Sequence, residues 1–140
     1  MRDGFLGTGD CGKVFKIMKV GEGTTTRGAQ GTKMYAAKRI YLQSMHTFEN
    51  EIEVLKKIDH PGMVQLIDVQ KMGKGYNYII MELVEGKTLA QYLREIYKSS
   101  HEMPRALFIT WALQMASIVN HLHTESKIIH GDLHQGNWIS

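Results

Sequence analysis

The sequence predicts an α+β fold in which a strand-rich first part is followed by helices. Three observations predict it. Apolar and polar residues alternate through residues 14–20, apolar residues recur every three or four positions between residues 43 and 59, and helical spacing prevails after residue 88. Alternation is the period of a strand, whereas spacing by three and four marks one face of a helix. Because strands and helices occupy separate parts of the chain, the predicted class is α+β, with five strands and one inserted helix before the remaining helices.

The first 40 residues have strand character, most clearly in residues 14–20 and 33–42. Residues 14–20, "VFKIMKV", alternate in polarity, and residues 33–42, "KMYAAKRIYL", are rich in β-branched and aromatic residues. Between them, residues 21–32 contain four glycines and no large apolar residue, which is typical of a hairpin loop.

A helix is predicted over residues 43–59, followed by Pro61 and Gly62, which end it. Its apolar face consists of Phe48, Ile52, Leu55 and Ile58. Glu51 lies on the same inward-facing stripe, where a carboxylate needs a cationic partner because an unpaired buried charge is costly. Lys38, in the middle of the preceding strand and flanked by alanine, is the expected partner.

Two further strands are predicted over residues 63–70 and 76–83, joined by a turn at residues 71–75. A short helix follows over residues 88–97, with Thr88 as its N-cap. A long helix is expected to start at Pro104 and continue to about Glu125. We interpret its apolar stripe as core; the stripe comprises Leu107, Trp111, Met115, Ile118 and Leu122, widened by Ala112 and Val119. The chain closes on a loop that we expect to be flanked by strands.

Composition favours a folded, cytoplasmic protein. Hydrophobic residues make up 43% and charged residues 22% of the chain, and no apolar run approaches the roughly 18 residues of a membrane span. The N-terminus lacks the apolar segment of a signal peptide, and one cysteine, Cys11, excludes an internal disulfide. A net charge of +3 is too small to indicate nucleic acid. The basic excess in residues 1–40 suits either a polyanionic ligand or solvated strand edges.

Two stretches carry candidate chemistry. In "GTGDCGKV", Gly7, Gly9 and Gly12 allow backbone N–H groups to approach phosphate, as in a dinucleotide fingerprint or a phosphate-binding hairpin. A dinucleotide site requires the last glycine to open a helix, whereas the following residues alternate as a strand, so the hairpin is favoured. The second stretch, residues 128–137, "IIHGDLHQGN", is either a catalytic loop or a metal site with His130, Asp132 and His134 as ligands.

Five motifs in order resemble those of eukaryotic-type protein kinases, over essentially all 140 residues. "GTGDCGKV" resembles the glycine-rich loop G-x-G-x-x-G-x-V, "YAAK" the strand motif V-A-I-K, and "HGDLHQGN" the catalytic loop H-R-D-L-x-x-x-N. "FENEIEVLKKIDHPGMVQL" resembles the C-helix, and "YIIMELVEGKTL" the hinge. The resemblance implies a protein kinase-like fold whose N-lobe, residues 1–83, is a five-stranded antiparallel sheet with the C-helix. A hinge at residues 84–87 and an incomplete helical C-lobe at residues 88–140 would follow.

The same resemblance implies ATP and Mg²⁺ as cofactors and assigns roles in phosphoryl transfer. Asp132 would accept the substrate hydroxyl proton, Lys38 held by Glu51 would clamp the α- and β-phosphates, and Asn137 would hold Mg²⁺. His130 would brace the loop. The phosphates would be covered by the backbone of Gly7, Thr8, Gly9, Asp10, Cys11 and Gly12. Adenine would contact Val14 and Ala36 above, Ile139 below, the gatekeeper Met81, and the main chain of Glu82 and Val84. Thr88 could reach the ribose, but we favour its role as a helix cap.

Three departures from the family pattern modify this interpretation. Gly131 replaces the usual arginine, which puts regulation through an activation-loop phosphate in doubt. His134 stands where Ser/Thr kinases carry lysine, and H-G-D-x-H-x-x-N is also frequent in aminoglycoside and choline phosphotransferases. The D-F-G aspartate is expected beyond Ser140, so we interpret the chain as a truncated piece, weakly stable and nearly inactive alone. The predicted function is ATP-dependent transfer of phosphate to Ser/Thr hydroxyls of proteins, with no nucleic-acid or membrane partner and no predicted oligomeric state. A small-molecule phosphotransferase and a pseudokinase are the alternatives.

Overall fold

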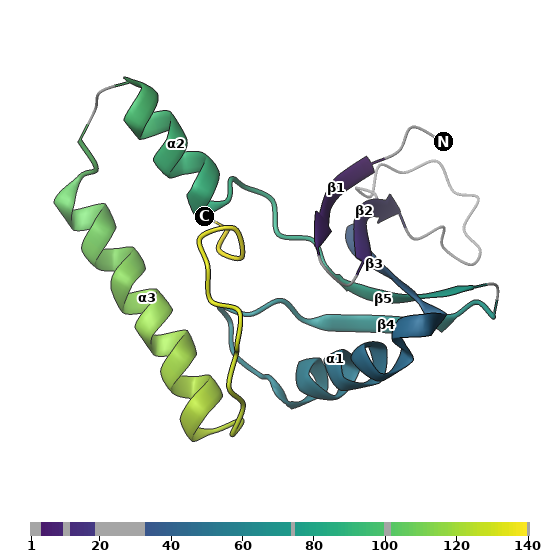
Figure 1. Ribbon diagram of the computed structural model, residues 1–140. Helices are drawn as coiled ribbons and strands as arrows, with labels where there is room; N and C mark the ends of the chain where they lie inside the picture. Colours follow the sequence, from purple (N-terminus) through teal and green to yellow (C-terminus); the bar gives the residue numbers. More distant parts are fainter. Residues whose placement is uncertain (1–3, 10–11, 19–32, 74, 100–101, 140) are drawn as a thin grey trace, which may run out of the picture. The chain divides into compact units, whose positions relative to one another are not determined.

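The structure is a computed structural model that describes residues 4–9, 12–18, 33–73, 75–99 and 102–139 (Figure 1). Contacts divide the chain into two units, the first formed by Met1–Lys56 and Val64–Leu83, and the second by Lys57–Met63 and Val84–Ser140. The predicted α+β class is confirmed, because five strands and one helix precede the two remaining helices. The predicted hairpin loop at residues 21–32 lies outside the described residues, as do Asp10 and Cys11.

The first unit is built on an antiparallel sheet with the strand order β1-β2-β3-β5-β4. The strands are β1 (Gly4–Gly9), β2 (Gly12–Met18), β3 (Met34–Tyr41), β4 (Leu66–Lys71) and β5 (Tyr76–Glu82). A single 3-10 turn, η1 (Leu42–Ser44), leads from β3 into helix α1 (Met45–Lys57). The sequence placed the start of this helix at residue 43 and the start of β4 at residue 63, so both predicted starts were too early.

Helix α1 packs against one face of this sheet (Figure 1). Phe48 is 1% exposed and packs with Ile40 of β3 and Ile79 of β5. Ile52 and Leu55, from the same predicted stripe, pack against this cluster. Complete burial of side chains of this size contributes roughly 1.5–3 kcal/mol each, which makes the cluster the main link between helix and sheet.

Among the described residues of the first unit, Asn77 of β5 is the polar side chain that is buried in the core, with 2% of its surface exposed. Its Oδ1 accepts a hydrogen bond from the Met72 N–H at 3.2 Å, and its Nδ2 lies 3.5 Å from the Met45 sulfur. These contacts reduce the penalty of burying an amide and join the β4–β5 turn to the start of α1.

The second unit contains helices α2 (Leu89–Ser99) and α3 (Arg105–Thr124). Thr88 caps α2 as predicted: its Oγ1 accepts a hydrogen bond from the Gln91 N–H at 3.2 Å. In return the Gln91 side chain accepts one from the Thr88 N–H at 2.8 Å, which completes a capping box.

Helix α3 places only part of its predicted stripe in the core. Ile118 and Leu122 are buried with Ile58, the last apolar residue of the stripe predicted for the first helix. Leu107, Trp111 and Met115 are half-buried, and Ala112 is exposed, so its assignment to the core was wrong. The helix also exposes Phe108 and Leu113, at 59% and 66%.

The C-terminal segment differs from the strand-flanked loop that the sequence suggested. Within residues 128–139 the structure has a single isolated β-bridge, between Ile139 and Thr88, and otherwise turns and irregular backbone. Trp138 of this segment packs against the cluster formed by Ile58, Ile118 and Leu122. The segment is therefore anchored by packing and by the start of α2 rather than by a strand ladder.

Candidate functional site

Lys38 and Glu51 form the ion pair that the sequence predicted. Lys38 on β3 directs its Nζ to both carboxylate oxygens of Glu51 on α1, each at 2.7 Å. The side chains are 22% and 23% exposed, so the pair is largely shielded from water. An ammonium held by both oxygens of one carboxylate has a fixed position and is suited to bind a phosphate oxygen.

Four of the predicted nucleotide-binding residues share one face of the sheet. Val14 on β2 lies directly opposite Lys38, and Ala36 lies directly opposite Met81 of β5. Directly opposed residues of antiparallel strands point to the same face, and so do residues two apart on one strand. Val14, Ala36, Lys38 and Met81 therefore lie on a common face, which is also the face that α1 covers.

The glycine-rich stretch forms the hairpin that the sequence favoured. Thr8 pairs with Lys13 and Gly9 with Gly12, and β2 begins at Gly12, so no helix follows the last glycine. A Cβ at Gly12 would come within 2.0 Å of the Arg39 carbonyl oxygen, so this glycine is required by strand packing. At Gly7, by contrast, a Cβ would meet nothing within 4 Å.

The end of β5 carries the predicted adenine contacts. The Glu82 N–H already donates a hydrogen bond to the Gln65 carbonyl at 2.9 Å. The amide of Glu82 is thus committed within the first unit. Val84, which belongs to the second unit, is 38% exposed.

The polar loop at residues 130–137 is organised around Asp132. The Asn137 Nδ2 donates to the Asp132 main-chain oxygen at 3.0 Å and to its Oδ2 at 3.2 Å. The His134 Nε2 lies 3.6 Å from the same Oδ2. His130 accepts a hydrogen bond from the Asp132 N–H at 3.3 Å, as expected of a brace for the loop. The Asp132 side chain is 74% exposed, so its carboxylate is accessible from solvent.

Helix α2 fixes the far side of this loop. The first amides of a helix have no partner within the helix. Here the Leu89 N–H donates to the Trp138 carbonyl at 2.8 Å, and the Ala90 N–H donates to the Gln135 carbonyl at 3.0 Å. The next amide, that of Gln91, is satisfied by the Thr88 cap. The N-terminus of α2 and the polar loop therefore form one hydrogen-bonded assembly.

A protein-family model described as the protein kinase domain matches residues 2–139 of the chain. The chain belongs to the protein kinase family. The match covers the Lys38–Glu51 pair and the polar loop at residues 130–137, which we call the candidate catalytic loop.

Curated kinases of several organisms are similar to this chain. The probable serine/threonine-protein kinase mps1 of Dictyostelium discoideum is 32% identical over 100% of the chain and 13% of its own length. The mouse serine/threonine-protein kinase Nek4 is 29% identical over 84% of the chain and 15% of its length. The human lymphokine-activated killer T-cell-originated protein kinase is 33% identical over 63% of the chain and 28% of its length. The chain thus spans a small fraction of each of these relatives.

Two glycines shape the candidate catalytic loop in ways that the sequence did not reveal. Gly131, at the position of the usual arginine, has φ +74°, a backbone conformation that side-chain-bearing residues rarely adopt. At Gly136 a Cβ would lie 2.8 Å from the His134 Cε1. The Gly136 N–H donates to the His134 Nδ1 at 3.0 Å, so this glycine both makes room for the imidazole and orients it.

The donor set of the loop fits Mg²⁺ better than a metal site made of two histidines and one aspartate. Among the described residues, no group of three or more His, Cys, Asp or Glu side chains is placed to hold a metal ion, so the reading of His130, Asp132 and His134 as metal ligands was wrong. Because the Asn137 Nδ2 faces Asp132, its amide Oδ1 is the atom left for a cation. A neutral carbonyl oxygen beside a carboxylate is a ligand set that Mg²⁺ accepts.

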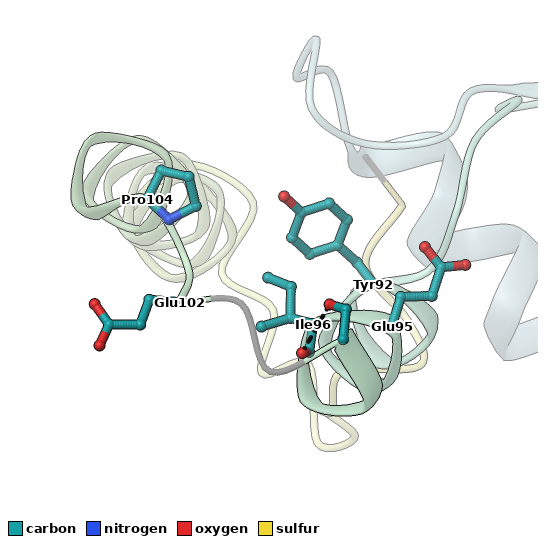
Figure 2. A pocket seen from close by; sticks show the side chains of 6 residues that line it. Tyr92, Glu95, Ile96, Glu102 and Pro104 are labelled. Atoms are coloured by element: carbon teal, nitrogen blue, oxygen red, sulfur yellow. Dashed lines mark hydrogen bonds between the residues drawn. The ribbon is translucent and has the colours of Figure 1, made fainter.

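A shallow pocket of about 360 Å³ in the second unit contains none of the predicted site residues (Figure 2). Tyr92, Glu95 and Ile96 of α2 line it together with Pro104, which precedes α3. Glu95 already pairs with Lys87 at 2.6 Å. The pocket is therefore separate from the residues predicted for phosphoryl transfer. In the described part of the chain, no helix has the length and hydropathy of a membrane span.

Proposed function

We propose that this chain provides the ATP-binding part of a protein kinase that transfers the γ-phosphate of ATP to Ser/Thr hydroxyls of proteins. The observation that carries the proposal is the pair of 2.7 Å contacts between the Lys38 Nζ and Glu51. A lysine that only solvated the edge of a strand would not be expected to pair with a carboxylate on a helix. Held in this way, the ammonium provides a fixed positive charge for the α- and β-phosphates.

Asp132 and Asn137 divide the work of the catalytic loop in this proposal. The Asn137 Nδ2 holds Oδ2 of Asp132, so Oδ1 remains to accept the proton of the attacking hydroxyl. The hydroxyl oxygen bonds to the γ-phosphorus while the bond from that phosphorus to the bridging oxygen of ADP breaks, and the proton passes to Asp132. Asn137 would hold Mg²⁺ through Oδ1, and the bound ion would neutralise charge on the phosphates.

The adenine contacts that we propose follow the family resemblance residue by residue. Val14, Ala36 and Met81 would provide the apolar contacts of the sheet, and Ile139 the one from the C-terminal segment. Because the Glu82 N–H is already bonded to Gln65, Glu82 would contact adenine through its carbonyl, and Val84 through its main chain. We propose residues 1–83 as the N-lobe, 84–87 as the hinge and 88–140 as an incomplete C-lobe.

The proposal also covers the acceptor residue, the cellular compartment and the activity of the 140 residues alone. The named relatives support transfer to Ser/Thr, and the single cysteine suits a reducing compartment such as the cytoplasm. No D-F-G sequence occurs among the 140 residues, so we propose that they transfer little or no phosphate without further chain. Transfer requires a second metal ligand, which that aspartate supplies in the family.

The test compares wild type and Asp132→Ala in a full-length protein that carries this chain. Phosphate transfer from labelled ATP to a peptide mixture should fall by about 10²–10⁴-fold, the usual contribution of a general base, while binding of a fluorescent nucleotide is retained. Asp68→Ala, on the exposed side of β4, is the matched control and should leave transfer unchanged. Phosphotyrosine alone among the products would contradict the Ser/Thr assignment. Phosphorylation of kanamycin or choline in place of peptides would identify a small-molecule phosphotransferase, and nucleotide binding without any transfer a pseudokinase.

A further inference from the structure

A stripe of aromatic side chains with one arginine at its centre crosses the sheet of the first unit. The ring of Phe5 on β1 lies 6.0 Å from that of Phe15 on β2, and the guanidinium carbon of Arg39 on β3 lies 5.2 Å from the Phe15 centroid. The same carbon lies 5.7 Å from the ring of Tyr41 and 5.5 Å from that of Tyr76 on β5. Tyr76 in turn contacts Tyr78, with centroids 5.5 Å apart. We call these six residues the Arg39 stripe.

The stripe occupies the face of the sheet opposite α1. Successive side chains of a strand point to alternate faces. On β3, Lys38 and Ile40 face α1, since one pairs with Glu51 and the other packs on Phe48. Arg39 and Tyr41 therefore face away from α1. The register agrees, because Phe5 pairs with Phe15, Tyr41 with Tyr76, and Arg39 with Tyr78.

Arg39 is a cation without an anionic partner in the described part of the first unit. None of the ion pairs found among the described residues includes it, and its buried Nε has no hydrogen-bond partner there. A buried donor left without an acceptor is unfavourable. The rings contribute cation–π attraction but no acceptor oxygen. Because Arg39 as a whole is partly exposed, an oxygen ligand from outside the unit would pair with its guanidinium charge.

The chemistry of the stripe selects the ligand. A guanidinium matches a carboxylate through two parallel N–H···O bonds, which makes a carboxylate the preferred partner of Arg39. Lys13 is the direct ladder neighbour of Arg39 and adds a second positive charge on the same face. Phe5 and Tyr41, at 53% and 41% exposure, supply apolar surface next to these charges. Tyrosine and arginine set in a rigid frame are the residues that most often dominate binding energy at protein interfaces.

We propose that the Arg39 stripe docks an acidic peptide segment of a partner protein, with a carboxylate on Arg39 and an aromatic or aliphatic side chain on the neighbouring rings. Nucleic acid fits less well, because phosphate binding gains from several cations along a track. The stripe offers one guanidinium and one neighbouring lysine amid six residues that are mostly aromatic. The surface lies on the face of the sheet opposite the Lys38–Glu51 pair, so docking there leaves that pair uncovered.

The experiment follows the arginine Nε–Hε NMR signals of the ¹⁵N-labelled chain during a titration. The probe is the peptide acetyl-EEYEE-amide, and acetyl-QQYQQ-amide is the uncharged match. Signals of Arg94 and Arg105, both exposed, serve as internal controls in the same spectra. We expect a saturable shift of the Arg39 signal with the acidic peptide, a much smaller shift with its amide match, and little change at Arg94 and Arg105.

Two variants sharpen the result. Arg39→Lys keeps the charge but removes the guanidinium fork and should weaken binding of EEYEE several-fold, whereas Arg94→Lys should leave it unchanged. Phe5→Ala removes an exposed ring without touching Arg39 and should weaken binding by a smaller factor, which keeps the test valid even if Arg39→Lys fails to fold. Equal shifts at all three arginines, equal binding of QQYQQ, an equal effect of inorganic phosphate, or the absence of any shift at Arg39 would each overturn the proposal.

Discussion

The two halves of the proposed catalytic machinery are held by different kinds of structure. Lys38 and Glu51 lie on separate elements, and their half-buried contact depends on how α1 packs on the sheet. Asp132 and Asn137 lie within one loop, are exposed, and depend on short-range hydrogen bonds and on the start of α2. The Lys38–Glu51 pair should therefore be sensitive to substitutions in the core. The Asp132–Asn137 pair should be sensitive to substitutions of the helix cap and of the loop glycines.

The largest expected effect comes from emptying the core under the Lys38–Glu51 pair. Phe48→Ala should lower the free energy of unfolding by about 3–5 kcal/mol, because it leaves a cavity between Ile40 and Ile79. Urea denaturation followed by circular dichroism measures this loss. Val54→Ala, at an exposed position of the same helix, is the control and should change stability far less. Equal losses in the two variants would show that α1 is not anchored through Phe48.

Removing the carboxylate of the pair should have the next largest effect. Glu51→Gln leaves a half-buried ammonium without its counter-charge, and we expect a loss of about 1.5–3 kcal/mol, the usual value of a hydrogen bond to a charged group. Glu53→Gln removes an exposed carboxylate from the same helix and should cost little. If both variants unfold at the same urea concentration, the pair contributes nothing to the stability of the first unit.

Thr88→Ala tests the support of the loop that contains Asp132 and Asn137, because Thr88 caps the helix α2 to which that loop is bonded. Loss of the capping hydroxyl should lower stability by about 1 kcal/mol. The amides of Leu89 and Ala90 should exchange with deuterium faster, because their bonds to the catalytic loop depend on an ordered start of α2. The amides of β3 should keep their exchange rates, which serves as the control within the same sample. Faster exchange throughout both units would mean that the cap at Thr88 does not stabilise the Asp132–Asn137 loop independently of the Lys38–Glu51 pair.

Gly136→Ala should have the smallest effect on stability and a clear effect on geometry. The added methyl meets the exposed ring of His134, which can move, so we expect a change within about 0.5 kcal/mol. The ring must leave its place beside Asp132, and the His134 side-chain NMR signals should shift. Gly7→Ala, where a methyl meets nothing within 4 Å, is the control and should leave those signals unchanged. Unchanged His134 signals in both variants would contradict the inference that Gly136 makes room for the His134 imidazole.

Side-chain periodicity explains what the sequence could predict. Alternation and helical spacing give the faces of strands and helices, so the α1 stripe, the sheet and the Lys38–Glu51 pair were all accessible from the residues. Motif order predicted membership of the protein kinase family, and the catalytic role of the loop at residues 130–137 stays a prediction. The capping role of Thr88 followed from residue type, although its partner Gln91 could also have been predicted from the spacing T-x-x-Q.

Backbone contacts between distant segments explain what the sequence could not predict. Nothing in the residue types indicates that the carbonyls of Gln135 and Trp138 accept the first amides of α2. For the same reason the last segment was assigned flanking strands, whereas it forms one bridge. Ala112 is exposed, and the residues of the Arg39 stripe lie together, because of which face of the helix or sheet meets a neighbouring element. Periodicity alone does not predict which face that is.

The hydrogen bonds from α2 to the loop also impose an order on folding. The donors, Leu89 and Ala90, precede helix α3 in the sequence, whereas the acceptors, Gln135 and Trp138, follow it. Closing the long segment between them costs entropy, which a preformed α3 reduces by shortening the flexible span. During synthesis on the ribosome, the loop around Asp132 would thus acquire its shape among the last parts of the second unit, and pulse-labelled hydrogen exchange should find the Leu89 amide protected after those of α3.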